Sequence, residues 1–127
     1  MTKKTYIVDG TKFSTLAEAA TEFTQVLGLT IPWNGNLDAF NDFLNGGFGT
    51  PGEGFILIWQ YSETSKMRLG FEETLRWLDE AARKSRPSNA SQIHDRIAAA
   101  RRKQGQTLFE TLVEIIRDHK DIHLQLK

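Results

Sequence analysis

FILIW, residues 55–59, is an unbroken apolar run in a chain whose other long segments carry helical patterns. Strands at the centre of parallel sheets read as continuous apolar runs, so we predict a buried central strand here. Residues 5–8 read as a strand near the start, and Ile122, Leu124 and Leu126 alternate as a closing strand. Strands separated by helices imply right-handed crossovers. The predicted fold class is therefore α/β, a small three-stranded parallel sheet covered by helices.

Two helices are expected between the first and second strands. Residues 15–27 repeat apolar side chains at three- and four-residue spacing, which predicts a core helix that Ser14 is placed to cap. Pro32 and the Asn34-Gly35 step then forbid a continuous helix. Asn36 can cap a second, shorter helix with its side chain.

A glycine-rich loop, NGGFGTPGEG at residues 45–54, precedes the central strand. Gly47, Gly49 and Gly52 formally spell G-x-G-x-x-G. A phosphate cradle needs the order strand, loop, helix, whereas the order here is helix, loop, strand. We therefore predict no nucleotide site, and expect the glycines to supply turns with positive φ.

The segment after Trp59 is helical almost to the end. One amphipathic segment contains Phe71 and Leu78, Arg86-Pro87-Ser88-Asn89 interrupts the pattern, and a second segment starts near Ser91. Thr107 and Glu110 predict a capping box at the start of a last helix. The whole chain, residues 1–127, is expected to form one domain.

Length and composition narrow the possible functions. The chain has 127 residues, a mass of 14.4 kDa and no cysteine, so disulfides, thiolate metal sites and a catalytic thiol are excluded. It has no apolar run long enough to span a bilayer, and MTKKTYIVDG lacks the apolar region of a secretory signal. We expect a cytoplasmic protein that does not contact membranes.

The formal net charge of zero is an average over two unlike segments. From Phe13 to Ser65 there are six acidic residues and no lysine or arginine. From Arg83 to Lys103 there are seven basic residues and only one acidic residue, Asp95. Charged patches steer oppositely charged partners, so the acidic segment suggests a basic protein more readily than a nucleic acid.

Asp38 and Asp42 lie four positions apart in IPWNGNLDAFNDFL, residues 31–44. On a helix they share one face, away from the apolar row that includes Phe40 and Leu44. Like charges at this spacing repel by about 0.2–0.5 kcal/mol, so a cationic partner would explain why both are present. The alternative is a solvated helix face, with Asp38 favoured by the helix N-terminus.

Several of these features together resemble the barstar family, protein inhibitors of ribonucleases. They are the first strand with Gly10, the helix at residues 15–27, Asn36-Leu37-Asp38-Ala39, Leu57-Ile58-Trp59 with Ser65-Lys66 beyond it, and the final helix and strand. The resemblance covers most of the chain outside residues 70–106. Relative to the family, that segment is expected to be a helical, basic insertion.

The resemblance implies an intracellular inhibitor, a monomer, that inserts an acidic helix and its preceding loop into a ribonuclease active site, where RNA phosphates would bind. Asp38 and Asp42 match the two interface aspartates of the family, and Asp118 matches a supporting acid. Trp33 and Asn36 fall in the matching loop, although a buried Trp33 that staples the turn is an equal alternative.

Two departures bear on the partner. Asn41 stands between the aspartates where the family can have an aromatic residue, and Pro32 stands where it can have tyrosine. Both remove stacking area, so we expect the partner to be a basic ribonuclease of the extracellular or toxin type, other than barnase itself. The basic insertion would repel such a nuclease beside Asp42, so we expect it on another face.

Inhibition has three alternatives among the classes of protein function. Catalysis is not expected, because His94, His119 and His123 form no plausible metal or acid–base site, and no cofactor is implied. Nucleic-acid binding through residues 83–103 remains an alternative that the zero net charge disfavours. A barstar-like adaptor that inhibits no nuclease is the third.

Overall fold

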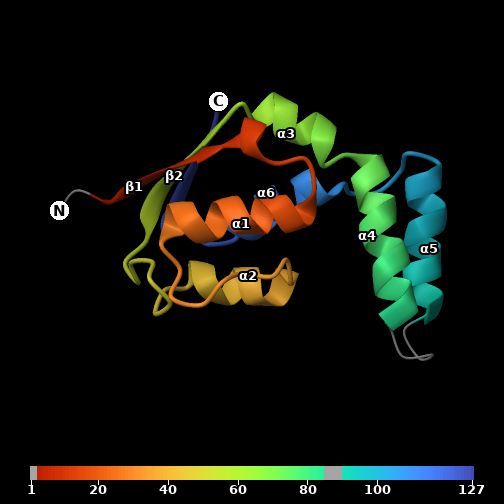
Figure 1. Ribbon diagram of the computed structural model, residues 1–127, viewed down its shortest axis with the longest axis horizontal. Helices are drawn as coiled ribbons and strands as arrows, with labels where there is room; N and C mark the ends of the chain where they lie inside the picture. Colours follow the sequence, from red (N-terminus) through yellow and green to blue (C-terminus); the bar gives the residue numbers. More distant parts are fainter. Residues whose placement is uncertain (1–2, 85–89) are drawn as a thin grey trace.

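The computed structural model describes residues 3–84 and 90–127, and the predicted interruption at residues 86–89 lies outside them (Figure 1). In chain order the elements are β1 (Thr5–Asp9), the 3-10 helix η1 (Gly10–Lys12), α1 (Leu16–Leu27), α2 (Leu37–Leu44), β2 (Phe55–Gln60), α3 (Ser62–Arg68), α4 (Phe71–Lys84), α5 (Ala90–Arg101), α6 (Leu108–Arg117) and β3 (Ile122–Leu126). None of the described helices combines the length and the hydropathy that a membrane-spanning segment requires.

The sheet has the order β1-β2-β3, and both strand pairs are parallel. Tyr6, Leu57 and Leu124 lie side by side in the three strands. The apolar run forms the central strand, as predicted, and Leu57 and Trp59 are fully buried. The α/β fold class is therefore confirmed.

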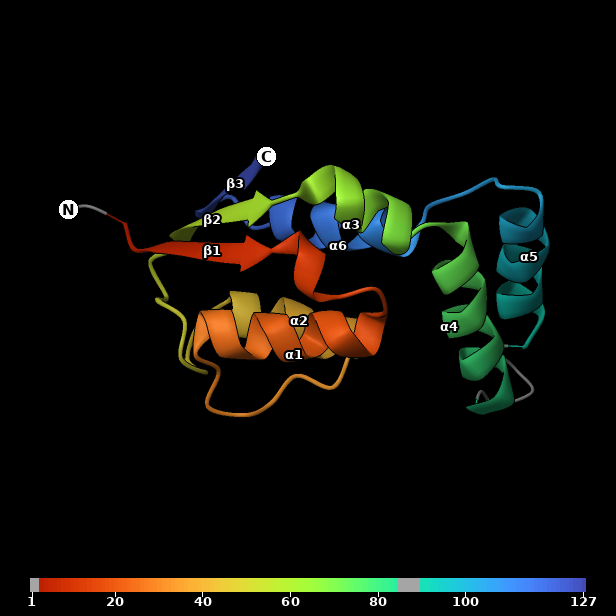
Figure 2. The same cartoon turned by 45° about the horizontal axis from the view of Figure 1, so that its top comes forward.

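The helices cover one face of this sheet (Figure 2). That face carries Val8 and Trp59, both fully buried, whereas Ile7 on the other face is 49% exposed. The strand order explains the arrangement. Both crossovers step in the same direction across the sheet, and right-handed connections that step the same way place their helices on the same side.

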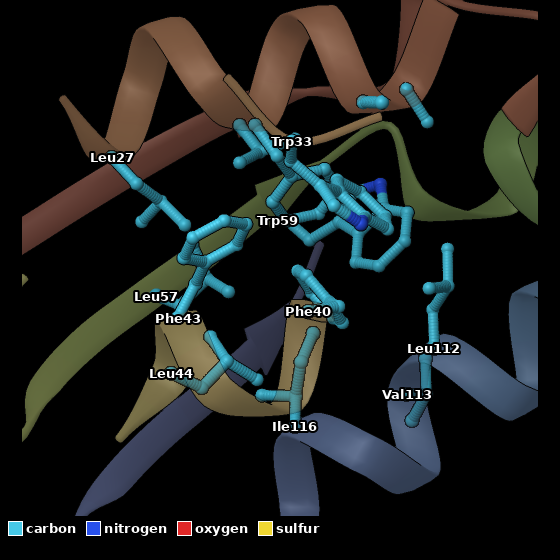
Figure 3. Packing of buried hydrophobic residues seen from close by; sticks show 14 of the residues in the cluster. Leu27, Trp33, Phe40, Phe43, Leu44, Leu57, Trp59, Leu112, Val113 and Ile116 are labelled. Atoms are coloured by element: carbon cyan, nitrogen blue, oxygen red, sulfur yellow. The ribbon is translucent and has the colours of Figure 1, made fainter. Parts of the chain in front are cut away.

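The core beneath the covered face combines aliphatic side chains with a cluster of aromatic rings (Figure 3). The ring of Phe23 lies 5.4 Å from the rings of Phe40 and Trp59, in edge-to-face geometry with both. Trp33 stacks on Phe40 with centroids 4.4 Å apart. Because Phe23 belongs to α1 and Phe40 to α2, this cluster fixes both helices on the sheet.

A second set of contacts joins the ends of β1 and β2 to α3. Trp59 Nε1 donates to Ser65 Oγ at 2.9 Å, and that hydroxyl donates to the Gly10 carbonyl at 3.3 Å. A Cβ on Gly10 would collide with Ser65 Oγ and the Gln60 carbonyl. The close packing of β1, β2 and α3 therefore requires glycine at position 10.

Most predicted helix starts are confirmed. Asn36 caps α2, and Thr107 with Glu110 forms the capping box of α6. The cap of α1 was predicted one residue too early, because Thr15 rather than Ser14 accepts the hydrogen bond from the Glu18 amide.

Helices α4 and α5 form a hairpin that projects from one end of the sheet layer (Figures 1 and 2). Its inner seam is a small separate cluster in which Leu78, Ile97 and Ala100 are buried. Trp77 packs against both this cluster and the main core. At its base, the Phe109 amide donates to the Leu69 carbonyl at 3.1 Å, so the excursion starts and ends at one point.

Candidate partner-binding surface

Helix α2 separates a buried face from an acidic one. Phe40, Phe43 and Leu44 are buried in the main core. Asp38 and Asp42 are both exposed, as their spacing predicted. The helix therefore presents two carboxylates to solvent from a backbone that its own apolar face holds in place.

The two carboxylates differ in their helix environment. Asp38 lies in the first turn, next to the Asn36 cap, where the helix dipole favours a negative charge by about 0.3–1 kcal/mol. Asp42 lies near the C-terminus, where the dipole disfavours it. In the part of the chain that the structure describes, the one ion pair joins Arg76 to Glu73. Neither aspartate is therefore neutralised by a described cation of its own chain.

The loop before α2 is held by hydrogen bonds at both ends. The Trp33 amide donates to Thr24 Oγ1 at 3.0 Å, and the Trp33 indole donates to the Asn36 carbonyl at 2.7 Å. The Asn36 amide in turn donates to Asn34 Oδ1 at 3.0 Å. These bonds fix the approach of the chain to α2 without a partner.

Trp33 does not present its side chain to a partner. It is 4% exposed and packs against the rings of both Phe23 and Phe40 in the core. Its expected role as a contact residue is therefore corrected to the alternative, a buried staple of the loop. The reason is the apolar space between α1 and α2, which the indole fills while its N–H still finds an acceptor.

The large apolar side chain exposed in this loop is that of Ile31, for which the sequence predicts no role. Its side chain is 53% exposed, two residues before the buried Trp33. No periodic pattern marks it, because it lies between the two helices. Its apolar side chain is therefore accessible at the surface of the loop that precedes α2.

The side chain of Asn41 forms a hydrogen bond within its own chain. His119 Nε2 and Asn41 Oδ1 lie 2.7 Å apart, and the ring nitrogen donates when the amide oxygen accepts. Both residues remain at the surface. Residue 119 thereby joins the end of α6 to the acidic helix, a link that spacing in the sequence cannot reveal.

Asp118 is exposed at the C-terminal cap of α6, next to His119 in the sequence. It lines a hollow of about 410 Å³ with Lys66, Glu110 and Leu126, and no α2 residue is among those that line it. The structure therefore brings Asp38, Asn41, Asp42 and His119 together, while the supporting role of Asp118 stays a prediction.

The helical hairpin lies closer to this surface than expected. Trp77 and Ala81 of α4 line one hollow together with Asn36 and Asp38. The expectation that residues 70–106 lie on another face is therefore wrong for α4. The cause is Glu73, which accepts a 2.7 Å hydrogen bond from the Leu16 amide and so holds α4 against the start of α1.

The basic side of the hairpin lies along the seam between its helices. Arg83, His94 and Arg101 line a hollow of about 540 Å³ together with Asp79. Arg96 lies over the Trp77 ring at 5.3 Å. Nucleic-acid binding through this segment stays a prediction.

Comparison with known protein families gives a match that covers most of the chain. The model of the family described as barstar (barnase inhibitor) matches residues 3–104. The chain belongs to the barstar family. No curated protein matches it.

Barstar family proteins are inhibitors of barnase-type ribonucleases rather than enzymes. The match includes the α4–α5 hairpin and stops before α6 and β3. Whether residues 70–106 are an insertion relative to the family therefore stays a prediction. Asp38, Asn41 and Asp42 all fall inside the matched residues.

Proposed function

We propose that this chain inhibits a basic ribonuclease by placing the acidic face of α2 in the active site of the enzyme. Asp38 and Asp42 would occupy positions where RNA phosphates otherwise bind, and the loop with Ile31 and Asn36 would contact the rim. The observation that carries this proposal is a fixed helix with two exposed carboxylates on one face and no described ion pair for either.

Asp42 would be the deeper anchor. A carboxylate accepts two parallel hydrogen bonds from an arginine, the residue that commonly holds phosphate. Asp42 gains nothing from the dipole of its own helix, so its charge is best explained by an external cation. Asp38 would add a second charge one helical turn away and increase electrostatic steering.

Rigidity favours tight binding by this surface. The aromatic cluster fixes α2 and the Trp33 hydrogen bonds fix its loop, so little conformational freedom would be lost on association. Asn41 is also held, through His119. The surface is therefore arranged before the nuclease arrives.

The test is a titration of the purified chain into a ribonuclease assay with a fluorogenic RNA substrate. Barnase and other small basic ribonucleases would serve as enzymes. Stoichiometric loss of cleavage, relieved by Asp42→Ala in a variant that remains folded, supports the proposal. If every enzyme tested still cleaves RNA when the chain is in molar excess over it, the adaptor alternative is favoured.

A further inference from the structure

A groove runs between the start of α2 and the hairpin. It consists of two hollows of about 320 and 290 Å³, both lined by Gly35, Asn36, Trp77 and Ala81. We call this the α2–α4 groove. One hollow is also lined by Asp38, so the groove opens onto the acidic face of α2.

The far wall of the groove is fixed. Glu73 is 8% exposed, bonds to the Leu16 amide, and holds Arg76 with two hydrogen bonds of 2.8 and 3.0 Å. Thr74 accepts a 2.8 Å hydrogen bond from the Leu108 amide. These contacts tie the first turns of α4 to α1 and α6, so the groove exists before any partner binds.

The groove combines an apolar floor with carboxylates. Trp77 and Ala81 are half-buried and supply apolar surface. Asp38 lines one hollow and Glu80 the other, and neither forms an ion pair among residues 3–84 and 90–127. Arg76 is neutralised by Glu73, which leaves Lys84 as the unpaired cation of the described lining.

We propose that the ribonuclease bound by Asp38 and Asp42 also seats a protruding segment carrying an arginine or lysine in the α2–α4 groove. Helix α4 is then the second half of the recognition surface, and the hairpin selects which nuclease fits. This inference rests on the proposed function. It follows from continuity, because a nuclease that engages Asp38 meets the wall formed by Trp77 and Ala81, and from the complementary charge at the Asp38 end.

A binding titration can follow both halves of the surface at once. The ¹⁵N-labelled chain is titrated in turn with unlabelled barnase and with the other small basic ribonucleases of the inhibition assay, because chemical shifts also register weak complexes. We expect shifts at the Asp38 and Asp42 amides together with the Trp77 indole N–H. Shifts on α2 that leave the Trp77 indole and the Ala81 amide unmoved would overturn this inference and leave the proposed function standing. No shift with any of these enzymes would overturn both.

A charge-matched pair of variants gives an independent result. Ala81→Arg fills the groove with a cation, whereas Ala98→Arg adds the same charge to the α5 side of the hairpin. We expect Ala81→Arg to weaken nuclease binding by about tenfold or more, since like charges in contact cost several kcal/mol. Ala98→Arg should change it by less than about threefold, through screened long-range repulsion alone. Equal effects of the two variants, with melting temperatures unchanged, would exclude the groove as a contact.

Discussion

His119 and Asn41 are hydrogen-bonded at 2.7 Å although 78 positions separate them. The bond joins the turn after α6 to the acidic face of α2. Asn41 lies between Asp38 and Asp42 in the sequence, so this bond orients a residue that the two aspartates flank. The C-terminal part of the chain therefore supports the candidate surface through this hydrogen bond.

Replacing His119 by alanine should weaken inhibition modestly. A hydrogen bond of this kind is worth about 0.5–1.5 kcal/mol, so the inhibition constant should rise by no more than about tenfold. Titration of ribonuclease activity measures the change. His123→Ala, at an exposed position in β3, is the matched control and should have no effect. If both variants lose the same amount of inhibition, His119 has no specific role in the partner-binding surface.

Asp42→Ala should cause the largest loss of inhibition. Truncating one partner of a buried charged pair costs about 2–5 kcal/mol, a range that rests in part on measurements of the barnase–barstar pair itself. The isolated chain should be as stable as before, or more stable by about 0.2–0.5 kcal/mol, because repulsion from Asp38 is removed. Inhibition assays and thermal unfolding together decide the matter. Retained inhibition with a lowered melting temperature would make Asp42 structural.

Salt should act mainly on the rate of association. The screening length falls from about 10 Å at 0.1 M to about 3 Å at 1 M ionic strength, which weakens steering by Asp38 and Asp42. Stopped-flow measurements should show slower association and a smaller change in dissociation. The double variant D38N/D42N should show a flatter salt dependence. An identical dependence in the variant would assign the steering to other charges.

Trp33→Ala should destabilise the chain rather than act first on binding. Removing a buried aromatic side chain costs about 3–5 kcal/mol of unfolding free energy, and Trp33 is 4% exposed. Chemical denaturation measures the loss. Ile31→Ala, two residues away and 53% exposed, should stay within about 0.5 kcal/mol of the parent. A stable Trp33→Ala that no longer inhibits would restore the tryptophan as a contact residue.

Asp9 should contribute to acid sensitivity. Its carboxylate accepts hydrogen bonds from the hydroxyl and amide of Thr11, and these lower its pKa from the ordinary value of 3.8. A lowered folded-state pKa adds stability that is fully present above pH 3.8 and is lost as pH falls through the folded pKa. Asp9→Asn should therefore lose less stability than the parent on acidification below pH 3.8. If the parent and Asp9→Asn lose the same free energy of unfolding as the pH falls, other acidic residues determine the acid sensitivity.

The elements that the sequence predicted well are those with local causes. The run at residues 55–59 gave the central strand, Asn36 gave the start of α2, and Thr107 with Glu110 gave the start of α6. The exposure of Asp38 and Asp42 followed from helical spacing alone. Each of these signals lies within a few residues of the feature that it predicts.

The features that the sequence missed depend on contacts between distant segments. Trp33 is buried because Phe23 and Phe40 leave space for it, and a tryptophan in a loop looks the same whether it is packed or exposed. The position of α4 depends on a bond between Glu73 and the Leu16 amide, 57 residues away. That only one sheet face is covered follows from the strand order, which periodicity does not contain.

The 3.1 Å bond between Leu69 and Phe109 brings the two ends of the hairpin excursion together. An excursion whose ends meet can be lengthened, shortened or exchanged during evolution while the sheet and the acidic helix keep their places. If α4 contacts the partner as proposed, the hairpin can diverge with a changing ribonuclease while the acidic helix is kept, as loops diverge on antibody frameworks. For protein engineering, the same junction is the natural place to graft a different hairpin and redirect the chain to a new target.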